Sequence, residues 1–166
     1  MSTQDNLMAA FAGESQANRK YLAFARKAEA EGFKQIARLF RAVAAAETVH
    51  AHNHLRAMDG VKATGVNLEA AIGGENYEVV SMYPPMLSEA EAEGDKRAAL
   101  SFKYALAVEK VHEMLYRQAA ESFAQGKDLP AKEYYVCPVC GNTHEGPMEG
   151  RCPVCNTPGE KFEKIS

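Results

Sequence analysis

Two copies of Glu-x-x-His, Glu47/His50 and Glu109/His112, limit what this chain can fold into more than any other feature of its sequence. On a helix, residues three apart project from nearly the same side, so each pair can bind one metal site together. Both pairs lie on otherwise apolar helical stripes, where an ionised carboxylate is costly unless a proton or a cation neutralises it. The repeat therefore predicts helices that pack around metal.

Each repeat is preceded by a further carboxylate, Glu14 by 33 positions and Glu75 by 34, with Glu78 close behind. This is the ligand pattern of a di-metal site in a four-helix bundle. Carboxylate and imidazole ligands suit iron or manganese, whereas zinc would fit but cannot change oxidation state. The predicted ligands are Glu14, Glu47, His50, Glu75, Glu78, Glu109 and His112.

Apolar periodicity predicts four helical segments with short, long and short connections. The longer connection, 61–74, contains glycine and has no sustained period, and Pro84-Pro85 predicts a kink or a break after Tyr83. We therefore expect an all-α four-helix bundle of the ferritin-like type, with one long crossover. The predicted helices are 3–31, 33–58, 75–93 and 96–125.

Two tyrosines lie near the predicted ligands along the chain. Tyr21 is two turns beyond Glu14, and Tyr83 is five residues beyond Glu78. Both could donate hydrogen bonds to groups around the metal, although ordinary half-buried tyrosines explain them equally well.

All four cysteines form two Cys-Pro-Val-Cys knuckles, at Cys137/Cys140 and Cys152/Cys155. In a reducing cytoplasm this spacing indicates a thiolate metal site, which fits one iron or one structural zinc. The metal is expected to supply much of the folding free energy of so small a module. Three aromatic residues are expected to cover the site: Tyr134, Tyr135 and Phe162.

The whole chain fits one full domain plus a small module. We expect a helical domain over 1–127, a linker over 128–133 and a small metal-stabilised β domain over 134–166. A net charge of -3 without a basic stripe argues against nucleic acid as a partner. With no apolar run near the roughly 20 residues of a membrane span and no signal-like N-terminus, we expect a cytoplasmic protein with no membrane association.

The order and spacing of these motifs resemble the rubrerythrin family over essentially the whole chain. The resemblance implies a ferritin-like di-iron domain followed by a rubredoxin-like domain, with two irons at the carboxylate site and one iron, replaceable by zinc, at the cysteines. It implies a peroxidase that reduces hydrogen peroxide and protects against oxidative stress. The motifs that carry it are Gly13-Glu-Ser-Gln-Ala17, Glu47-Thr-Val-His50, Gly74-Glu-Asn-Tyr-Glu78, Met82-Tyr-Pro84, Glu109-Lys-Val-His112 and both knuckles.

The resemblance also implies roles and partners. Glu47 and Glu109 bridge the irons, and Glu78 exchanges with His50 when the oxidation state changes. Electrons arrive from a donor protein, either rubredoxin or a reductase that uses NAD(P)H. Because the linker is expected to hold the two centres of one chain apart, a homodimer or higher homo-oligomer is the expected active unit. The catalytic residues expected are Glu14, Glu47, His50, Glu78, Glu109, Tyr21 and Tyr83.

Two other functions remain open at this point. One is iron oxidation and storage, for which a dedicated electron path through cysteines is unnecessary. The other is a scaffold whose cysteine module is a zinc ribbon that recruits a partner.

Overall fold

The computed structural model describes residues 2–165, and its contacts divide the chain into two compact units, Met1–Lys62 and Ala63–Ser166. Each unit is described by itself. The domain limits expected from the sequence, 1–127, 128–133 and 134–166, stay predictions. Between residues 2 and 165, no helix combines the length and the apolar character needed to cross a membrane.

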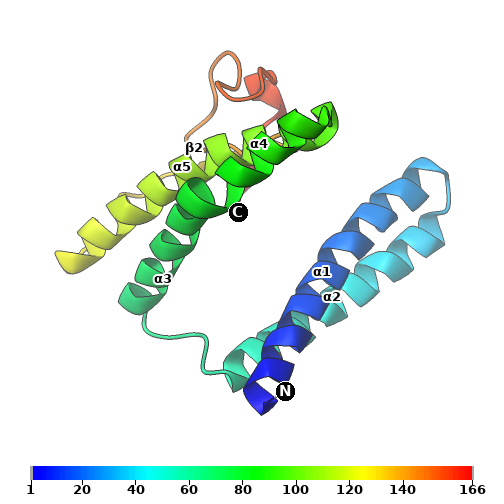
Figure 1. Cartoon of the computed structure of the whole chain (residues 1–166), viewed down its shortest axis with the longest axis horizontal. Coiled ribbons are helices and arrows are strands. Elements are labelled where there is room, and N and C mark those ends of the chain that lie inside the picture. Colours follow the sequence, from blue (N-terminus) through cyan, green and yellow to red (C-terminus); the bar gives the residue numbers. More distant parts are fainter. Residues whose placement is uncertain (1, 166) are drawn as a thin grey trace. The chain divides into compact units, whose positions relative to one another are not determined.

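The first unit is a hairpin of two long helices, α1 (Thr3–Ala30) and α2 (Lys34–Ala57), drawn in blue and cyan in Figure 1. Ser2 and Asp5 form a capping box that satisfies backbone donors at the start of α1. Gly32, with φ of 87°, turns the chain between the helices. Both helices match the predicted segments to within one residue at each end.

Small side chains line the contact between α1 and α2. Ala37, Ala44 and Ala51 recur every seven residues on α2 and are at most 6% exposed, so the backbones can approach closely. The buried Asn18 of α1 donates through Nδ2 to the carbonyl of Ala44 at 2.6 Å and to Oγ1 of Thr48 at 2.7 Å. These bonds fix the register of the hairpin.

The second unit contains a long helical run that packs against α5 (Lys96–Ala124). Gly94 in the left-handed conformation and Asp95, which caps α5, form the turn between the two. The run consists of α3 (Thr64–Tyr77), the π-helix η1 (Glu78–Met82) and α4 (Tyr83–Glu93).

The connection expected over 61–74 is shorter in the structure. Only the six residues 58–63 separate α2 from α3, which begins at Thr64 instead of near residue 75. Tight packing, which no periodicity reveals, holds this part of α3: a Cβ on Gly65 would lie 2.7 Å from Cε1 of Phe123. Gly65 therefore marks a close helix contact and not a flexible connection.

The prolines predicted a kink or a break after Tyr83, and the helix does not break there. Helical hydrogen bonding changes one turn earlier, in η1, and the helix then continues into α4 with prolines among its first residues. Pro84 and Pro85 have no N–H to donate to the carbonyls of the preceding turn. At the start of an α-helix that loss is tolerated, and the wider turn before it accommodates the rings.

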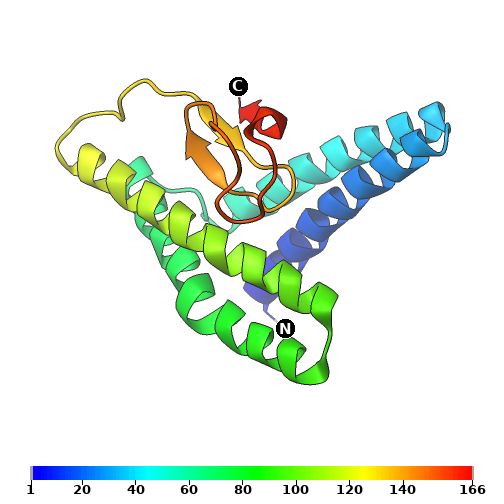
Figure 2. The same ribbon diagram turned by 90° about the horizontal axis from the view of Figure 1, so that it is seen from above.

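The cysteine module forms a three-stranded antiparallel sheet of β1 (Tyr134–Val136), β2 (Thr143–Glu145) and β3 (Glu163–Ile165), in the order β2-β1-β3. A short 3-10 helix, η2 (Gly159–Lys161), precedes β3. The chain leaves the end of α5 and returns to the module through an extended segment (Figure 2).

Two cysteines and one aromatic ring form the core of this module. Cys137, Cys152 and Phe162 are buried together, and Tyr135 packs against them as expected. Tyr134 does not: it lies among the residues that line a cavity beside α5. Neighbouring residues of a strand point to opposite faces, so the two tyrosines cannot cover one site.

Candidate metal centres

A set of three metal-type ligands lies within the first unit: Glu14 from α1 with Glu47 and His50 from α2. We call it the α2 set. Nδ1 of His50 lies 2.9 Å from Oε2 of Glu47 and 3.9 Å from Oε1 of Glu14. The imidazole is 53% exposed, and its Nε2 has no protein partner among residues 2–165.

The second unit holds a matching set, Glu75 from α3 with Glu109 and His112 from α5. We call it the α5 set. Nδ1 of His112 lies 2.6 Å from Oε2 of Glu109 and 3.8 Å from Oε2 of Glu75. These distances repeat those of the α2 set. The His112 side chain, however, is only 27% exposed.

Within the α5 set, Glu75 has the surroundings that most disfavour an ionised side chain. Burial and the neighbouring Glu109 raise the pKa of its carboxyl to about 7. Its Oε2 is buried and has no hydrogen-bond partner in the described part of the chain. A buried carboxylate oxygen without a partner is rare in folded proteins, and a cation satisfies it. The α5 set therefore fits a metal ion.

Glu78 is the first residue of η1, and Tyr83 directly follows η1. Both lie close enough to the α5 set for its charges to shift their pKa values. Burial and Glu109 raise the pKa of Glu78. Burial and then Glu78 raise the pKa of Tyr83, so its hydroxyl keeps its proton. The Tyr83 ring also contacts the ring of Phe102, with centroids 6.3 Å apart.

Tyr21 is placed differently. Its ring belongs to an aromatic cluster of the hairpin, with centroids 6.2 Å from those of Phe24 and Phe40. No hydrogen bond joins its hydroxyl to a carboxylate among residues 2–165. The structure thus gives Tyr21 a packing role, and its predicted role near the metal stays untested.

The four cysteines converge on one point. Their sulfur atoms all lie within 4.8 Å of one another, with Cys137 and Cys155 at 3.5 Å and Cys140 and Cys152 at 3.5 Å. Four thiolates around one ion at about 2.3 Å give sulfur separations of about 3.8 Å. The observed separations fit a single tetrahedral ion.

The two knuckles have matching backbones. In the first knuckle (137–142) the N–H of Cys137 donates to Asn142 and that of Gly141 to Cys137. In the second (152–157) Cys152 donates to Thr157 and Asn156 to Cys152. Gly141 and Asn156 occupy the equivalent left-handed positions, with φ of 83° and 64°. Such turns direct both sulfurs of a pair to the same side.

The thiols differ in acidity. Burial raises the pKa of Cys140 and that of Cys152. Burial opposes the Cys155 thiolate too, but hydrogen bonds from Thr157 outweigh it and lower the pKa of Cys155 to about 6. A metal must displace protons from the buried thiols when it binds. Cys155, with its lowered pKa, is the ligand that is most readily a thiolate beforehand.

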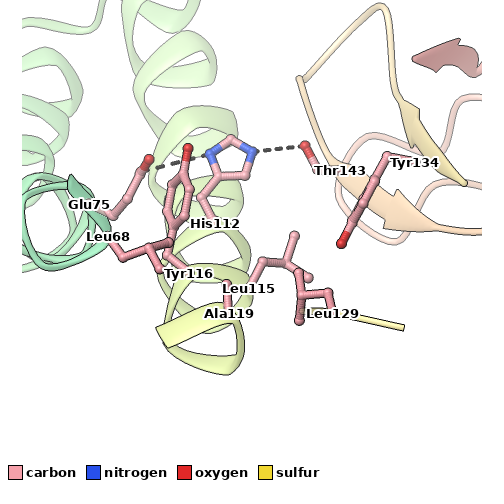
Figure 3. Close-up of a pocket in the computed structure, with 9 residues that line it drawn as sticks. All are labelled: Leu68, Glu75, His112, Leu115, Tyr116, Ala119, Leu129, Tyr134 and Thr143. Atoms are coloured by element: carbon pink, nitrogen blue, oxygen red, sulfur yellow. Dashed lines mark hydrogen bonds and ion pairs between the residues drawn. The ribbon is translucent and has the colours of Figure 1, made fainter. Parts of the chain in front are cut away.

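The first knuckle contacts α5 next to the α5 set. A Cβ on Gly141 would lie 3.9 Å from Cγ1 of Val108, which is 2% exposed. One turn further on, Nε2 of His112 lies 3.0 Å from Oγ1 of Thr143 (Figure 3). The expectation that the linker keeps the module of a chain away from that chain's own ligands is therefore wrong for the α5 set.

A helical protein with two Glu/Glu/His sets and an ordered four-thiolate module defines a class: carboxylate-type di-iron proteins that carry a rubredoxin-like iron site. A family model described as Rubrerythrin matches residues 5–120, and the chain belongs to the rubrerythrin family. Its donor sets fit the iron of both centres, two ions at the carboxylates and histidines and one at the cysteines.

Similar proteins span nearly the whole chain. Rubrerythrin-2 of Clostridium acetobutylicum is 37% identical over 97% of this chain and 95% of its own length. Nigerythrin of Nitratidesulfovibrio vulgaris is 35% identical over 97% of this chain and 85% of its own. A solved structure of nigerythrin in a partially reduced state superposes with a TM-score of 0.59, at 34% identity, over 99% of this chain and 87% of that one. Family membership supports a di-iron oxidoreductase of oxidative-stress defence.

Sequence reasoning missed Thr143 and Val108. Both act through contacts between a helix and a module that are about 30 residues apart in sequence, as the 31-residue separation of His112 and Thr143 shows. Neither periodicity nor motif spacing contains that information.

Proposed function

We propose that this protein is a non-haem peroxidase that reduces hydrogen peroxide to water and receives its electrons through the four-thiolate iron. The observation that carries the proposal is the hydrogen bond between Thr143 of the cysteine module and His112 of the α5 set. Neither iron storage nor a zinc-ribbon scaffold needs the cysteine module beside a metal-binding histidine. The direct contact favours electron transfer over both alternatives.

The reaction consumes one peroxide, two electrons and two protons, breaks the O–O bond and yields two waters. Iron held by the carboxylates and histidines would supply the electrons. The carboxylates of the two Glu/Glu/His sets would balance the change in metal charge. A homodimer or higher homo-oligomer is the proposed active unit.

Individual ligands have distinct proposed roles. Glu47 and Glu109 would be shared by the two irons, and Glu14, Glu75 and His112 would be ligands in every oxidation state. His50 and Glu78 would be the ligands that replace each other when the oxidation state changes. The exposure of the His50 ring and the lack of a partner at its Nε2 support this mobility, because a ring without an outer hydrogen bond is free to turn.

Tyr83 is the proposed proton donor to the oxygen that leaves as water. Its raised pKa keeps the hydroxyl protonated at neutral pH, and its surroundings include the carboxylate of Glu78. Proton donation by a positioned side chain accelerates such steps by about 10²–10⁴-fold. Tyr21, which packs among aromatic rings, is the weaker candidate.

Electrons enter one at a time at the cysteine module. Four thiolates leave no open position for a ligand, so the ion they hold exchanges electrons without binding substrate. The donor is a rubredoxin or a reductase that uses NAD(P)H, and the reaction takes place in the cytoplasm.

Electron counting tests the proposed function. The full chain is loaded with iron, reduced completely and titrated anaerobically with hydrogen peroxide, while iron oxidation and oxygen release are followed. The proposal predicts two electrons consumed for each peroxide, and no oxygen released. Ferric mineral that accumulates beyond the bound irons would instead indicate iron storage, and zinc at the cysteines of natively isolated protein would indicate a scaffold.

A further inference from the structure

A cavity of about 410 Å³ lies within the second unit, between α3, α5, the segment that follows α5 and the cysteine module. Its polar residues gather at one end, where Glu75 and His112 of the α5 set line it together with Thr143 (Figure 3). A molecule that occupies this cavity would place one end at the metal ligands and the rest among apolar side chains. The other lining residues are Leu68, Leu115, Tyr116, Ala119, Leu129 and Tyr134.

The apolar lining continues along α5 beyond this cavity. A second cavity of about 470 Å³ shares Leu68, Ala119 and Leu129 with the first and reaches Phe123 in the last turn of α5. From His112 to Phe123 the helix rises about 16 Å, at 1.5 Å per residue. We call the two adjoining cavities the α5 crevice. The crevice has the shape expected for an extended chain whose one end meets the α5 set.

Hydrogen peroxide does not account for the size or the apolar lining of the α5 crevice. A water molecule occupies about 30 Å³ of the liquid, and hydrogen peroxide has only one oxygen atom more. Its hydroxyl groups gain no hydrogen bonds from leucine side chains. Cavities of about 300–1,000 Å³ that are mainly apolar, with a few polar groups at one point, are typical of binding sites for small organic molecules.

The α5 set determines which chemical group of an organic molecule could react at this end of the crevice. Glu75 and His112 belong to a donor set that fits iron in a family of oxidoreductases. Under the proposed function, electrons delivered there break an O–O bond. A hydroperoxide group carries that bond and is uncharged, so it adds no negative charge beside Glu75 and Glu109. The molecule that matches both ends of the crevice is an alkyl hydroperoxide.

We propose that the α5 crevice binds the chain of an alkyl hydroperoxide, and that the protein reduces organic hydroperoxides as well as hydrogen peroxide. The inference rests on the proposed function, to which it adds a further substrate class. One hydroperoxide consumes two electrons from ferrous iron and two protons. The O–O bond breaks and each of its oxygens takes up one proton, so the products are one alcohol and one water.

The dependence of turnover on chain length is the first test. For the intact, iron-loaded protein, kcat/KM is compared for ethyl, butyl, hexyl and octyl hydroperoxide. Each CH₂ group that leaves water for the crevice should raise kcat/KM about two- to fourfold, the upper value corresponding to complete transfer out of water. Values of kcat/KM that stay level or fall from ethyl to octyl hydroperoxide would contradict the inference.

Binding without turnover is the second measurement. Alcohols of the same chain lengths have no O–O bond to reduce, so calorimetric titration of the intact protein reports their binding alone. Octanol should bind more tightly than butanol, because burial of the longer chain removes more apolar surface from water. Equal affinities for the two alcohols, or no binding of octanol, would show that the crevice is only a gap between helix and module.

A substitution that fills the crevice separates the two substrate classes. Ala119 lines both cavities and has no role in metal binding, so Ala119→Phe should block the chain and leave hydrogen peroxide turnover within about twofold of the wild type. Octanol affinity and kcat/KM for octyl hydroperoxide should each fall about tenfold, the effect of losing roughly two buried CH₂ groups. Unchanged octyl hydroperoxide kinetics, or an equal loss for both substrates, would overturn the assignment.

Two further variants complete the design. Leu129→Trp fills the crevice from the segment after α5, so it tests the same point without altering the helix if Ala119→Phe does not fold. Ala124→Phe is the matched control, because Ala124 is exposed at the end of α5. The control should leave both substrates and octanol binding as in the wild type, and a loss as large as in Ala119→Phe would contradict the inference.

Failure of the proposed function would look different. In that case the iron-loaded wild type would turn over neither hydrogen peroxide nor any alkyl hydroperoxide. The octanol titrations of the wild type and of Ala119→Phe would still decide whether the α5 crevice binds apolar chains.

Discussion

The backbone N–H of Tyr83 donates to the carbonyl of Glu78, five residues back in the chain. In an α-helix, five steps of about 100° would turn Tyr83 about 140° away from Glu78. The wider turn of η1 instead stacks residues five apart, so phenol and carboxylate share a face. The π-helix therefore places the hydroxyl of Tyr83 where burial, and then the nearby carboxylates, raise its pKa.

Replacing Tyr83 by Phe should lower kcat/KM for peroxide by about a hundredfold, the lower end of what a positioned acid contributes. The ring contact with Phe102 is kept, so metal content and thermal stability should change little. Tyr77→Phe is the matched control, because Tyr77 is 59% exposed on the same helical run. Equal peroxide kinetics in Tyr83→Phe and Tyr77→Phe would remove Tyr83 from the mechanism.

Glu109→Ala should abolish peroxide reduction, with a loss of activity greater than about a hundredfold. Even residues that only hydrogen-bond to a metal ligand can lower activity by about a hundredfold when they are replaced. Glu109 is the nearest partner of His112 and the main charge beside Glu75. The visible spectrum of the thiolate iron should stay intact. The exposed Glu121→Ala on the same helix is the control. Turnover that survives in Glu109→Ala would show that this glutamate is not a required bridge.

Metal binding to the apoprotein should become tighter as pH rises toward about 7, because Glu75 must lose a proton to bind. The same shift has the opposite effect on the metal-free fold. The pKa of Glu75 rises from its ordinary value of 4.5 to about 7 on folding, so the native state binds more protons between these values. The free energy of unfolding of the apoprotein should therefore fall as pH rises through this window.

Glu75→Gln checks both effects. The variant should lose this part of the pH dependence of unfolding, measured by chemical denaturation at several pH values, and should bind metal more weakly throughout. An apoprotein whose stability rises between pH 4.5 and 7 by the same amount with and without Glu75 would exclude the proposed protonation.

Two glycines of α3 should respond differently to alanine. Gly73 has no neighbour within 4 Å of an added Cβ, so Gly73→Ala should stabilise the protein by about 0.5–1 kcal/mol through helix propensity. At Gly65 the added Cβ would meet Phe123 at 2.7 Å, and the ring would have to move. Gly65→Ala should therefore gain less or destabilise. Equal gains at the two sites in thermal unfolding would mean that Gly65 is not a close contact.

The ligand sets were predictable because their spacing follows helix geometry. Glu47 with His50, and Glu109 with His112, meet across three positions of one helix, and Glu14 and Glu75 join them from the neighbouring helix. The spacing of the cysteines predicted the thiolate site equally directly. Each Cys-x-x-Cys pair closes its own turn, so local sequence determines most of the module.

The features that the sequence did not predict depend on packing between segments. The start of α3 was missed because Gly65 has a packing role that is visible only once Phe123 lies against it. The π turn was not predicted. The prolines indicated only a kink or a break after Tyr83, because Pro84 signals lost hydrogen bonds but not how the turn before it adjusts. The bond from Thr143 to His112 joins distant segments, and no local pattern encodes it.

The most direct test of the central claim is the visible spectrum of the iron-loaded, fully reduced chain after a single addition of hydrogen peroxide. The account predicts that the ferric thiolate absorption returns as electrons leave the cysteine site for peroxide, and that Glu109→Ala prevents this return. A thiolate iron that stays reduced in the wild type, or re-oxidises equally fast in Glu109→Ala, would contradict the account.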